Sequence, residues 1–97
     1  MLYRIIVTEK AQGEALDAFL YYEEAQGGLG IRFLESLQKV YELLSQNPQF
    51  YSFVHSDREK TLRDVKLDGF PFVILFDVLD DEVIVYSVLN TYKNPEY

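Results

Sequence analysis

The sequence predicts an α+β fold in which a two-helix hairpin packs on a small antiparallel-rich sheet, with the element order β-α-α-β-β-β. Two amphipathic helical patterns lie between residues 11 and 46, with a glycine-rich turn between them. Three strand-like apolar runs, joined by two-residue links, occupy the second half of the chain. Because 97 residues are too few for two useful hydrophobic cores, we expect one domain over residues 1–97.

The first half of the chain is predicted to be one strand followed by two helices. Leu2–Thr8 is short and rich in β-branched residues, as strands are. From Ala11 to about Gln26, apolar residues recur at spacings of three and four. Gly27–Gly30 provides the positive-φ conformations that end a helix and turn the chain. A second helix follows and ends at Asn47-Pro48, because proline excludes the preceding residue from helical geometry. The short link predicts an antiparallel hairpin.

The second half is predicted to be an irregular connection followed by three strands. The polar segment Pro48–Lys60 has no clear periodicity. The strands predicted after it are Thr61–Leu67, Phe70–Leu79 and Glu82–Leu89. The links Asp68-Gly69 and Asp80-Asp81 are too short for a parallel crossover, so these strands are expected to be antiparallel neighbours.

The last two predicted strands are nearly continuous apolar runs, whereas a strand with one face in water should alternate. Both sheet faces are therefore expected to be covered. The helices can cover one face, and the other requires the chain ends, the 48–60 segment or another molecule. The periodicities place ten residues in the core: Leu16, Phe19, Leu20, Leu34, Leu37, Tyr41, Leu44, Ile74, Phe76 and Val85.

Composition and charge exclude several classes of function. Nine basic residues face sixteen acidic ones, for a net charge of −7, which opposes non-specific binding to nucleic acid. The absence of cysteine excludes disulfides, thiolate zinc sites and a cysteine nucleophile. No apolar run approaches the length of a membrane span, and the first residues do not resemble a secretory signal, so a cytoplasmic location is expected.

Four of the nine basic residues lie within nine positions: Arg58, Lys60, Arg63 and Lys66. Strand alternation places Arg63 on the same side as Val65, where a guanidinium usually faces a cleft or a partner. Lys66 falls on the opposite side. The alternative interpretation is a solvated edge strand, which commonly carries basic residues.

Other polar groups have simpler structural explanations. His55 lies beside Ser56 and Asp57, but catalytic triads are assembled from distant segments, so a surface loop is the better interpretation. The acidic residues at 77–82 lack the spacing of a calcium loop. We therefore expect no metal and no cofactor. Tyr92 and Lys93 follow the last strand directly, where they could donate a hydrogen bond and bind a phosphate.

Three segments, together with the element order, make a distinctive combination: Leu44-Ser45-Gln46-Asn47-Pro48, Leu62-Arg63-Asp64-Val65-Lys66-Leu67 before Phe70-Pro71-Phe72, and Asn90-Thr91-Tyr92-Lys93-Asn94-Pro95. This combination resembles the RelE/ParE superfamily of bacterial toxins, often called plasmid stabilisation proteins, over nearly the whole chain. The resemblance implies the toxin of a type II toxin–antitoxin operon, held inactive by a cognate antitoxin that wraps it. It also implies a choice of target, since the RelE branch cleaves mRNA on the ribosome and the ParE branch poisons DNA gyrase.

By position, Arg63 is similar to the strand arginine of the family, and Lys93 to the basic residue of its C-terminal motif, with Tyr92 beside it. These three would be the catalytic residues of a metal-independent nuclease, with Tyr86 as a further candidate for proton transfer. Asn90 stands where many relatives have a histidine. Relatives are also usually strongly basic and often carry a second C-terminal basic residue.

These departures favour a ParE-like, gyrase-directed or ribosome-inactive protein over an mRNA-cleaving enzyme, because an acidic chain is repelled by ribosomal RNA. The expected partners are a cognate antitoxin and DNA gyrase, with a homodimer as an alternative when the antitoxin is absent and no membrane association. A function from another class stays open: a non-toxic interaction module that binds a peptide on its apolar sheet face. The residues predicted to bind a target are Arg63, Lys66, Tyr86, Asn90 and Lys93.

Overall fold

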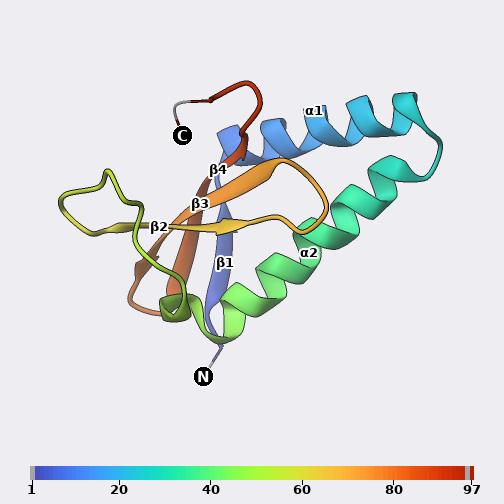
Figure 1. Cartoon of the computed structure of the whole chain (residues 1–97). Helices are drawn as coiled ribbons and strands as arrows, with labels where there is room; N and C mark the ends of the chain where they lie inside the picture. The colour runs from blue at the N-terminus through green and yellow to red at the C-terminus, as the bar shows by residue number, and fades with distance from the viewer. Residues whose placement is uncertain (1, 96) are drawn as a thin grey trace.

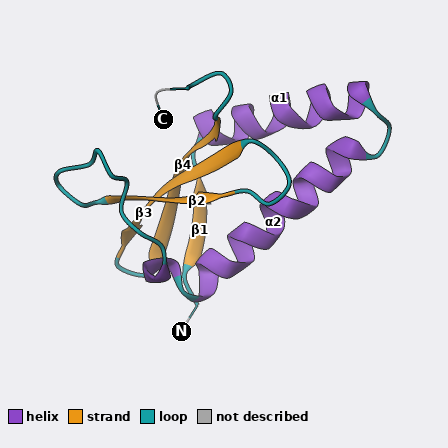
Figure 2. Cartoon of the chain, viewed as in Figure 1, coloured by secondary structure: helices purple, strands orange, loops and turns teal. Residues whose placement is uncertain are grey.

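The computed structural model describes residues 2–95 and 97, and it has the predicted α+β architecture (Figures 1 and 2). Two helices lie against one side of a four-stranded sheet, and the C-terminal end of the chain returns toward the sheet. In chain order the elements are β1 (Arg4–Val7), α1 (Glu9–Ala25), α2 (Leu29–Gln46), the short 3-10 helix η1 (Pro48–Phe50), β2 (Leu62–Lys66), β3 (Phe72–Leu79) and β4 (Glu82–Asn90).

The sheet is mixed, with the strand order β1-β4-β3-β2. The last three strands are antiparallel neighbours, as their short links require, and β1 pairs in parallel with β4. Between β3 and β4 the register shifts at Leu75/Phe76, because Phe76 opposes Val85 while Leu75 opposes Ser87. Tyr86 is therefore an extra residue in β4, as in a β-bulge.

The helix hairpin is closed by contacts at its turn. The Glu23 carboxylate accepts hydrogen bonds from the backbone N–H groups of Gly28 and Gly30, at 3.0–3.1 Å. Gly28 has a φ of 90°, the left-handed conformation for which glycine is favoured. At Gly30, an added Cβ would lie 2.7 Å from the Phe19 carbonyl oxygen, so α1 and α2 approach each other too closely for a side chain there. The helices diverge from this turn toward the sheet (Figure 1).

Each helix is attached to a different end of the sheet. Thr8, directly after β1, caps α1 by accepting a hydrogen bond from the backbone N–H of Ala11 at 3.2 Å. Glu14 of α1 accepts from the Ser87 hydroxyl and from the backbone N–H of Val88, both at 2.9 Å, which holds the helix to β4 beyond the end of β1. At the opposite end, the backbone N–H of Tyr3 donates to the carbonyl of Ser45 at the end of α2.

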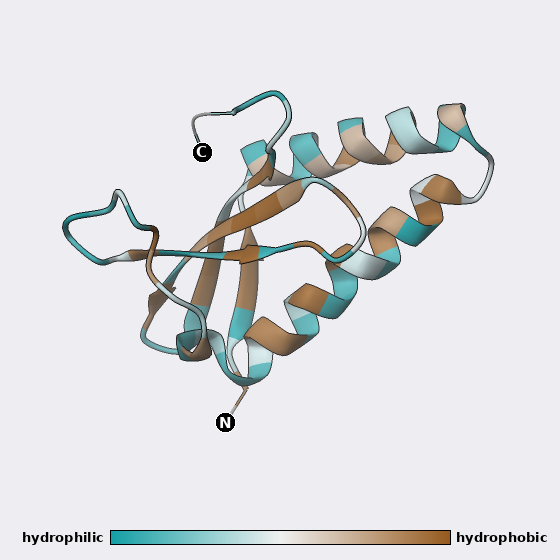
Figure 3. Cartoon of the chain, viewed as in Figure 1, coloured by the Kyte–Doolittle hydropathy of each residue, from teal (hydrophilic) through white to brown (hydrophobic). Residues whose placement is uncertain are grey.

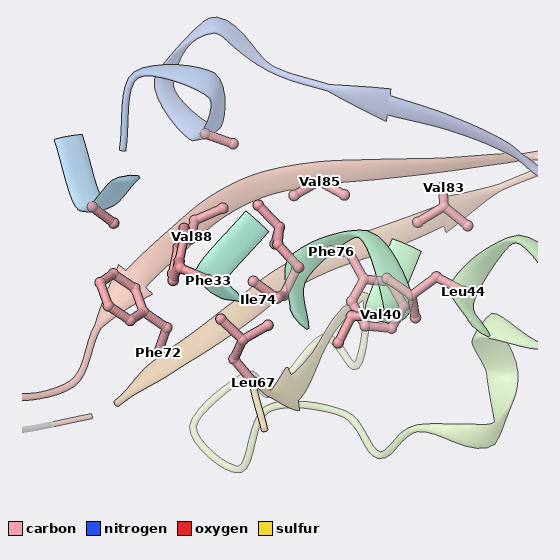
Figure 4. Packing of buried hydrophobic residues seen from close by; sticks show 13 residues of the cluster. Phe33, Val40, Leu44, Leu67, Phe72, Ile74, Phe76, Val83, Val85 and Val88 are labelled. Carbon is pink, nitrogen blue, oxygen red and sulfur yellow. The ribbon is translucent and has the colours of Figure 1, made fainter. Parts of the chain in front are cut away.

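The core lies between α2 and the two central strands, whose side chains point toward each other in Figure 4. Figure 3 shows the central strands as hydrophobic and the loop before β2 as hydrophilic. Among the described residues, no helix is long and apolar enough to cross a membrane. The buried apolar residues are Ala11, Ala18, Phe33, Leu37, Val40, Leu44, Leu67, Phe72, Val73, Ile74, Phe76, Val83, Val85 and Val88.

Five of the ten predicted core residues are buried: Leu37, Leu44, Ile74, Phe76 and Val85. Phe19 and Tyr41 are half-buried. The prediction was wrong for three leucines, since Leu16 is 56% exposed, Leu20 53% and Leu34 38%. The reason is the orientation of α1, which turns Ala11 and Ala18 rather than its leucines toward the sheet. Because the helices diverge, Leu16 and Leu34 face the space between them.

We predict opposite effects for two glycine substitutions. Gly30→Ala should lower the free energy of unfolding by about 1–3 kcal/mol, because its Cβ would overlap backbone and side-chain atoms of Phe19. Gly13→Ala, within α1 and with open space around its Cα, should raise the free energy by about 0.5–1 kcal/mol. Urea denaturation of both variants measures the difference. Equal effects would mean that the helices do not meet closely at Gly30.

Candidate functional site

An apolar groove lies between the two helices, with β1 as its floor. Its volume is about 670 Å³, and its residues come from three elements that the diverging helices hold apart. The lining residues are Ile5 and Val7 of β1, Gln12, Ala15, Leu16 and Phe19 of α1, and Leu34, Leu37 and Tyr41 of α2. Gln12 is the single amide among them, and its Nε2 already donates to the Val7 carbonyl at 2.8 Å. This groove therefore offers contact area for an apolar partner surface.

Tyr41 places a polar atom at the wall of the groove. Burial raises the pKa of the Tyr41 phenol to about 12, and its buried hydroxyl has no hydrogen-bond partner within the described part of the chain. Leaving a buried polar group unpaired costs about 1–3 kcal/mol. The Tyr41 hydroxyl is therefore a destabilising buried donor beneath the groove surface.

Arg63 is held by the segment before β2. Its side chain shares a sheet face with Phe76, the core residue opposite it, as strand parity predicted. The guanidinium Nη1 donates to the Tyr51 carbonyl at 2.6 Å, and its carbon lies 3.9 Å from the centre of the Phe53 ring. Backbone bridging between Phe53 and Arg63 also covers the free edge of β2. Arg63 is thus half-buried and engaged in contacts within the chain.

Three of the other predicted residues, Asn90, Tyr92 and Lys93, form a C-terminal turn built around Asn90. The Asn90 side-chain oxygen accepts from the backbone N–H groups of Tyr92 and Lys93, at 2.9 and 3.1 Å. Thr91 anchors the turn by donating to the Pro71 carbonyl from both its N–H and its hydroxyl. Tyr92 is 82% exposed, and Lys93 is exposed too. Asn90 therefore has a clear local role, as the cap that presents Tyr92 and Lys93 to solvent.

The structure brings Asn90, Tyr92 and Lys93 together but places Arg63 elsewhere on the sheet. Arg63 on β2 pairs with Phe76 of β3, and Asn90 on β4 pairs with Phe72 of β3. Phe72 and Phe76 are four residues apart, and β2 and β4 lie on opposite sides of β3. With about 3.3 Å per residue and about 4.8 Å between strands, the two Cα atoms are about 16 Å apart. Lys66 is exposed on β2, and Tyr86 is exposed at the bulge in β4.

The second sheet face is partly covered by the chain itself. The Tyr97 hydroxyl donates to Asp64 of β2, and burial together with this bond raises the pKa of Tyr97. The cavity beneath the C-terminal segment has a volume of about 440 Å³ and is lined by Val54, His55, Ser56, Asp64, Leu89, Asn94 and Tyr97. The expected cover from a chain end and the 48–60 segment is therefore present.

The loop before β2 is organised by Asp57. Its carboxylate accepts from the backbone N–H groups of Glu59, Thr61 and Leu62, at 3.2, 2.9 and 2.7 Å. The bond from Leu62 is the main cause of a pKa for Asp57 below its ordinary value of 3.8. The Asp57 carboxylate thus binds the backbone of its own loop, and His55 and Ser56 are exposed. Within the described residues, no three His, Cys, Asp or Glu side chains are placed to hold a metal ion.

The architecture is that of a small α+β protein with an apolar groove between its two helices and exposed basic groups at separate positions. Residues 5–95 match the family described as "ParE toxin of type II toxin-antitoxin system, parDE". The chain therefore belongs to the ParE toxin family of type II toxin–antitoxin systems, in agreement with the resemblance found in the sequence.

Comparison with solved structures supports the fold. A chain of the "Chromosomal ParDE TA system from P. aeruginosa" is similar, with a TM-score of 0.78 and 17% sequence identity. The match covers 92% of this chain and 96% of that chain. No curated protein sequence matches significantly.

The sequence predicted the two amphipathic helices but not the groove between them. The feature that could have predicted the groove is the width of the apolar stripe on each helix. On α2, Ile31 and Leu34 extend the apolar surface beyond what one sheet contact can bury, and on α1 Leu16 and Leu20 do the same. Stripes this wide on both helices of a hairpin indicate a second contact surface.

We predict that the loop before β2 loses order in acid. Because folding lowers the pKa of Asp57, its contribution is complete well above pH 3.8 and is lost as the pH falls through the lower folded value. Amide hydrogen exchange at Thr61 and Leu62 should be slow at neutral pH and faster in acid, after correction for intrinsic rates. Asp57→Ala should remove the protection at every pH, and Asp17→Ala, far from this loop in sequence, serves as the control. Unchanged protection in Asp57→Ala would contradict the assignment.

Proposed function

We propose that this protein is a toxin kept inactive by a cognate antitoxin that occupies the groove between α1 and α2. The observation that supports this most directly is the groove itself, because two of its leucines, Leu16 and Leu34, are exposed to solvent rather than buried in the core. Monomeric proteins rarely expose contiguous apolar surfaces without a partner. Membership of a toxin–antitoxin family identifies the antitoxin as the natural candidate for that partner.

We further propose that the toxic action is directed at DNA gyrase rather than at mRNA. Cleavage of RNA without a metal requires an acid, a base and a charge-stabilising cation around one phosphate. The strand register puts the Cα atoms of Arg63 and Asn90 about 16 Å apart. The Arg63 guanidinium also contacts the Tyr51 carbonyl and the Phe53 ring. The net charge of −7 also opposes entry into the ribosome. Both observations favour the gyrase-directed branch.

The proposal places the toxic surface at Lys93 and Arg63. Lys93→Ala changes an exposed side chain and should abolish growth inhibition while leaving the thermal midpoint within a few degrees. Arg63→Ala should also abolish it, with a measurable stability loss from the contacts with Tyr51 and Phe53. Growth after induction without the antitoxin is the measurement, and Lys39→Ala on α2 is the control. Toxicity that survives both changes would place the active surface elsewhere.

Assays on purified protein separate the possible targets. Inhibition of gyrase supercoiling without inhibition of cell-free translation is the expected result. Inhibition of translation alone would favour the RNA-cleaving branch. A soluble wild type that inhibits neither assay nor growth would favour the interaction-module alternative.

Neutralisation should depend on the groove. Leu16→Ser should leave the toxin active but weaken rescue by the co-expressed product of the adjacent reading frame, because a groove leucine is lost from the interface. Leu43→Ser is a matched control, since Leu43 is 49% exposed but does not line the groove. Rescue that is unaffected by Leu16→Ser would contradict docking in the groove.

A further inference from the structure

Aromatic side chains gather where the last turns of α1, the link between β2 and β3, and the C-terminal turn meet. The centre of the Tyr22 ring lies 4.9 Å from that of Phe70 and 5.3 Å from that of Tyr21. Burial is the main cause of a raised pKa for Tyr22, and the neighbouring phenols of Tyr21 and Tyr92 raise it further. We call Tyr21, Tyr22, Phe70 and Tyr92 the tyrosine patch. It joins three segments that are far apart in the sequence.

Two rings of the patch are presented to solvent, since Tyr21 is 70% exposed and Tyr92 82%. The position of Tyr92 is fixed by the bonds of the C-terminal turn. Thr91 donates twice to the Pro71 carbonyl, directly after Phe70 in the chain. The Tyr92 N–H itself donates to the side chain at the start of the turn. Because the backbone beneath this ring is already ordered, a partner that binds it meets a smaller entropic cost.

The tyrosine patch and the apolar groove lie on different sides of α1. Glu14, which accepts a hydrogen bond from the Val88 N–H in β4, is one heptad before Tyr21, so the two point to nearly the same side. Tyr21 is about 140° round the helix from Leu16 of the groove. A segment docked in the groove would therefore leave Tyr21 uncovered. The patch instead continues the exposed turn that carries Lys93.

From this arrangement we propose that the tyrosine patch binds the protein surface on which the toxin acts, through the rings of Tyr21 and Tyr92. This rests on the proposed function, and it extends the toxic surface from the C-terminal turn onto α1. Tyrosine is enriched among residues that dominate binding energy, because its large ring gives much contact area with few rotatable bonds. The complementary surface is apolar at its centre and carries a carboxylate that meets Lys93.

The charges around the patch favour a protein partner over a nucleic acid. Proteins that stack nucleic-acid bases on aromatic rings also follow the phosphates with a basic groove. Here Asp17 and Glu24 are exposed on α1, within about 60° of Tyr21 round the helix. Two carboxylates beside one ring repel phosphates, whereas a protein surface can offer them hydrogen-bond donors. The net charge of −7 acts in the same direction.

Binding of the full-length protein to purified DNA gyrase, measured without DNA by biolayer interferometry, tests the proposal. Tyr21→Ser and Tyr92→Ser should each weaken binding at least tenfold, because each removes a ring that contacts the partner. Tyr21→Phe keeps the ring and should bind within threefold of the wild type. Phe50→Ser is the matched control and should leave binding unchanged. Phe50 is 76% exposed and packs edge-on against another aromatic ring, but it lies in η1, near the bottom of Figure 1, whereas α1 lies near the top.

Three further measurements use the same variants. Growth inhibition should be lost in Tyr21→Ser and kept in Phe50→Ser. Co-purification with the product of the adjacent reading frame should be kept in Tyr21→Ser, because the groove is on another side of α1. A single-stranded oligothymidine of 12 nucleotides should bind the wild type at least tenfold more weakly than gyrase does. Circular dichroism and thermal midpoints verify that each variant is folded.

Several results would overturn the proposal. Gyrase binding that Tyr21→Ser and Tyr92→Ser leave unchanged would remove the patch from the toxic surface and leave the gyrase-directed function in place. Loss of co-purification in a folded Tyr21→Ser variant would assign the patch to the antitoxin instead. Oligothymidine binding as tight as gyrase binding, and lost in Tyr21→Ser, would assign it to a nucleic acid.

The proposed function fails separately. A wild type that arrests growth without binding gyrase would contradict the gyrase target, and the comparison of Tyr21→Ser with Phe50→Ser in the growth assay would still decide whether the patch contacts the actual target. A wild type that neither binds gyrase nor arrests growth would overturn both.

Discussion

The close contact of α1 and α2 at Gly30 determines the shape of the apolar groove. Two contacts hold the helices together there. Glu23 accepts a hydrogen bond from the backbone of the turn, and Gly30 lies so close to Phe19 that a side chain would not fit. At their other ends the helices are attached to opposite ends of the sheet, through Glu14 and Ser45. A hairpin fixed in this way must open toward the sheet. The groove is the space that this opening leaves, with β1 exposed at its floor.

The fold could be predicted from the sequence because its determinants are local. Gly27–Gly30 and Asn47-Pro48 set the helix ends, and links too short for a crossover forced the last three strands to be antiparallel. The parallel pairing of β1 with β4 joins distant segments, and no local pattern encodes it. The burial of particular leucines also depended on tertiary geometry. An apolar stripe shows that a helix face avoids water, but the angle between two helices decides which part of it meets the sheet.

At the candidate site, too, local features could be predicted from the sequence and tertiary contacts could not. Strand parity correctly placed the Arg63 side chain on the core face, opposite Phe76. Its actual partners, the Tyr51 carbonyl and the Phe53 ring, come from an irregular segment whose path no periodicity could predict. Likewise, the sequence indicated that Asn90 lies where the last strand ends, and it is the final residue of β4. Its role as the cap of a turn depends on hydrogen bonds that form only when the chain reverses beside Pro71.

The acidity of the chain bears on the proposed target of the toxin, and its exposed leucines bear on the proposed partner. Negative charge keeps a protein with exposed leucines in solution, because like molecules repel each other. The same charge opposes approach to ribosomal RNA, which supports the proposed gyrase-directed branch. Docking of an antitoxin in the groove would depend on apolar burial instead. Two different surface properties thus underlie the two proposals.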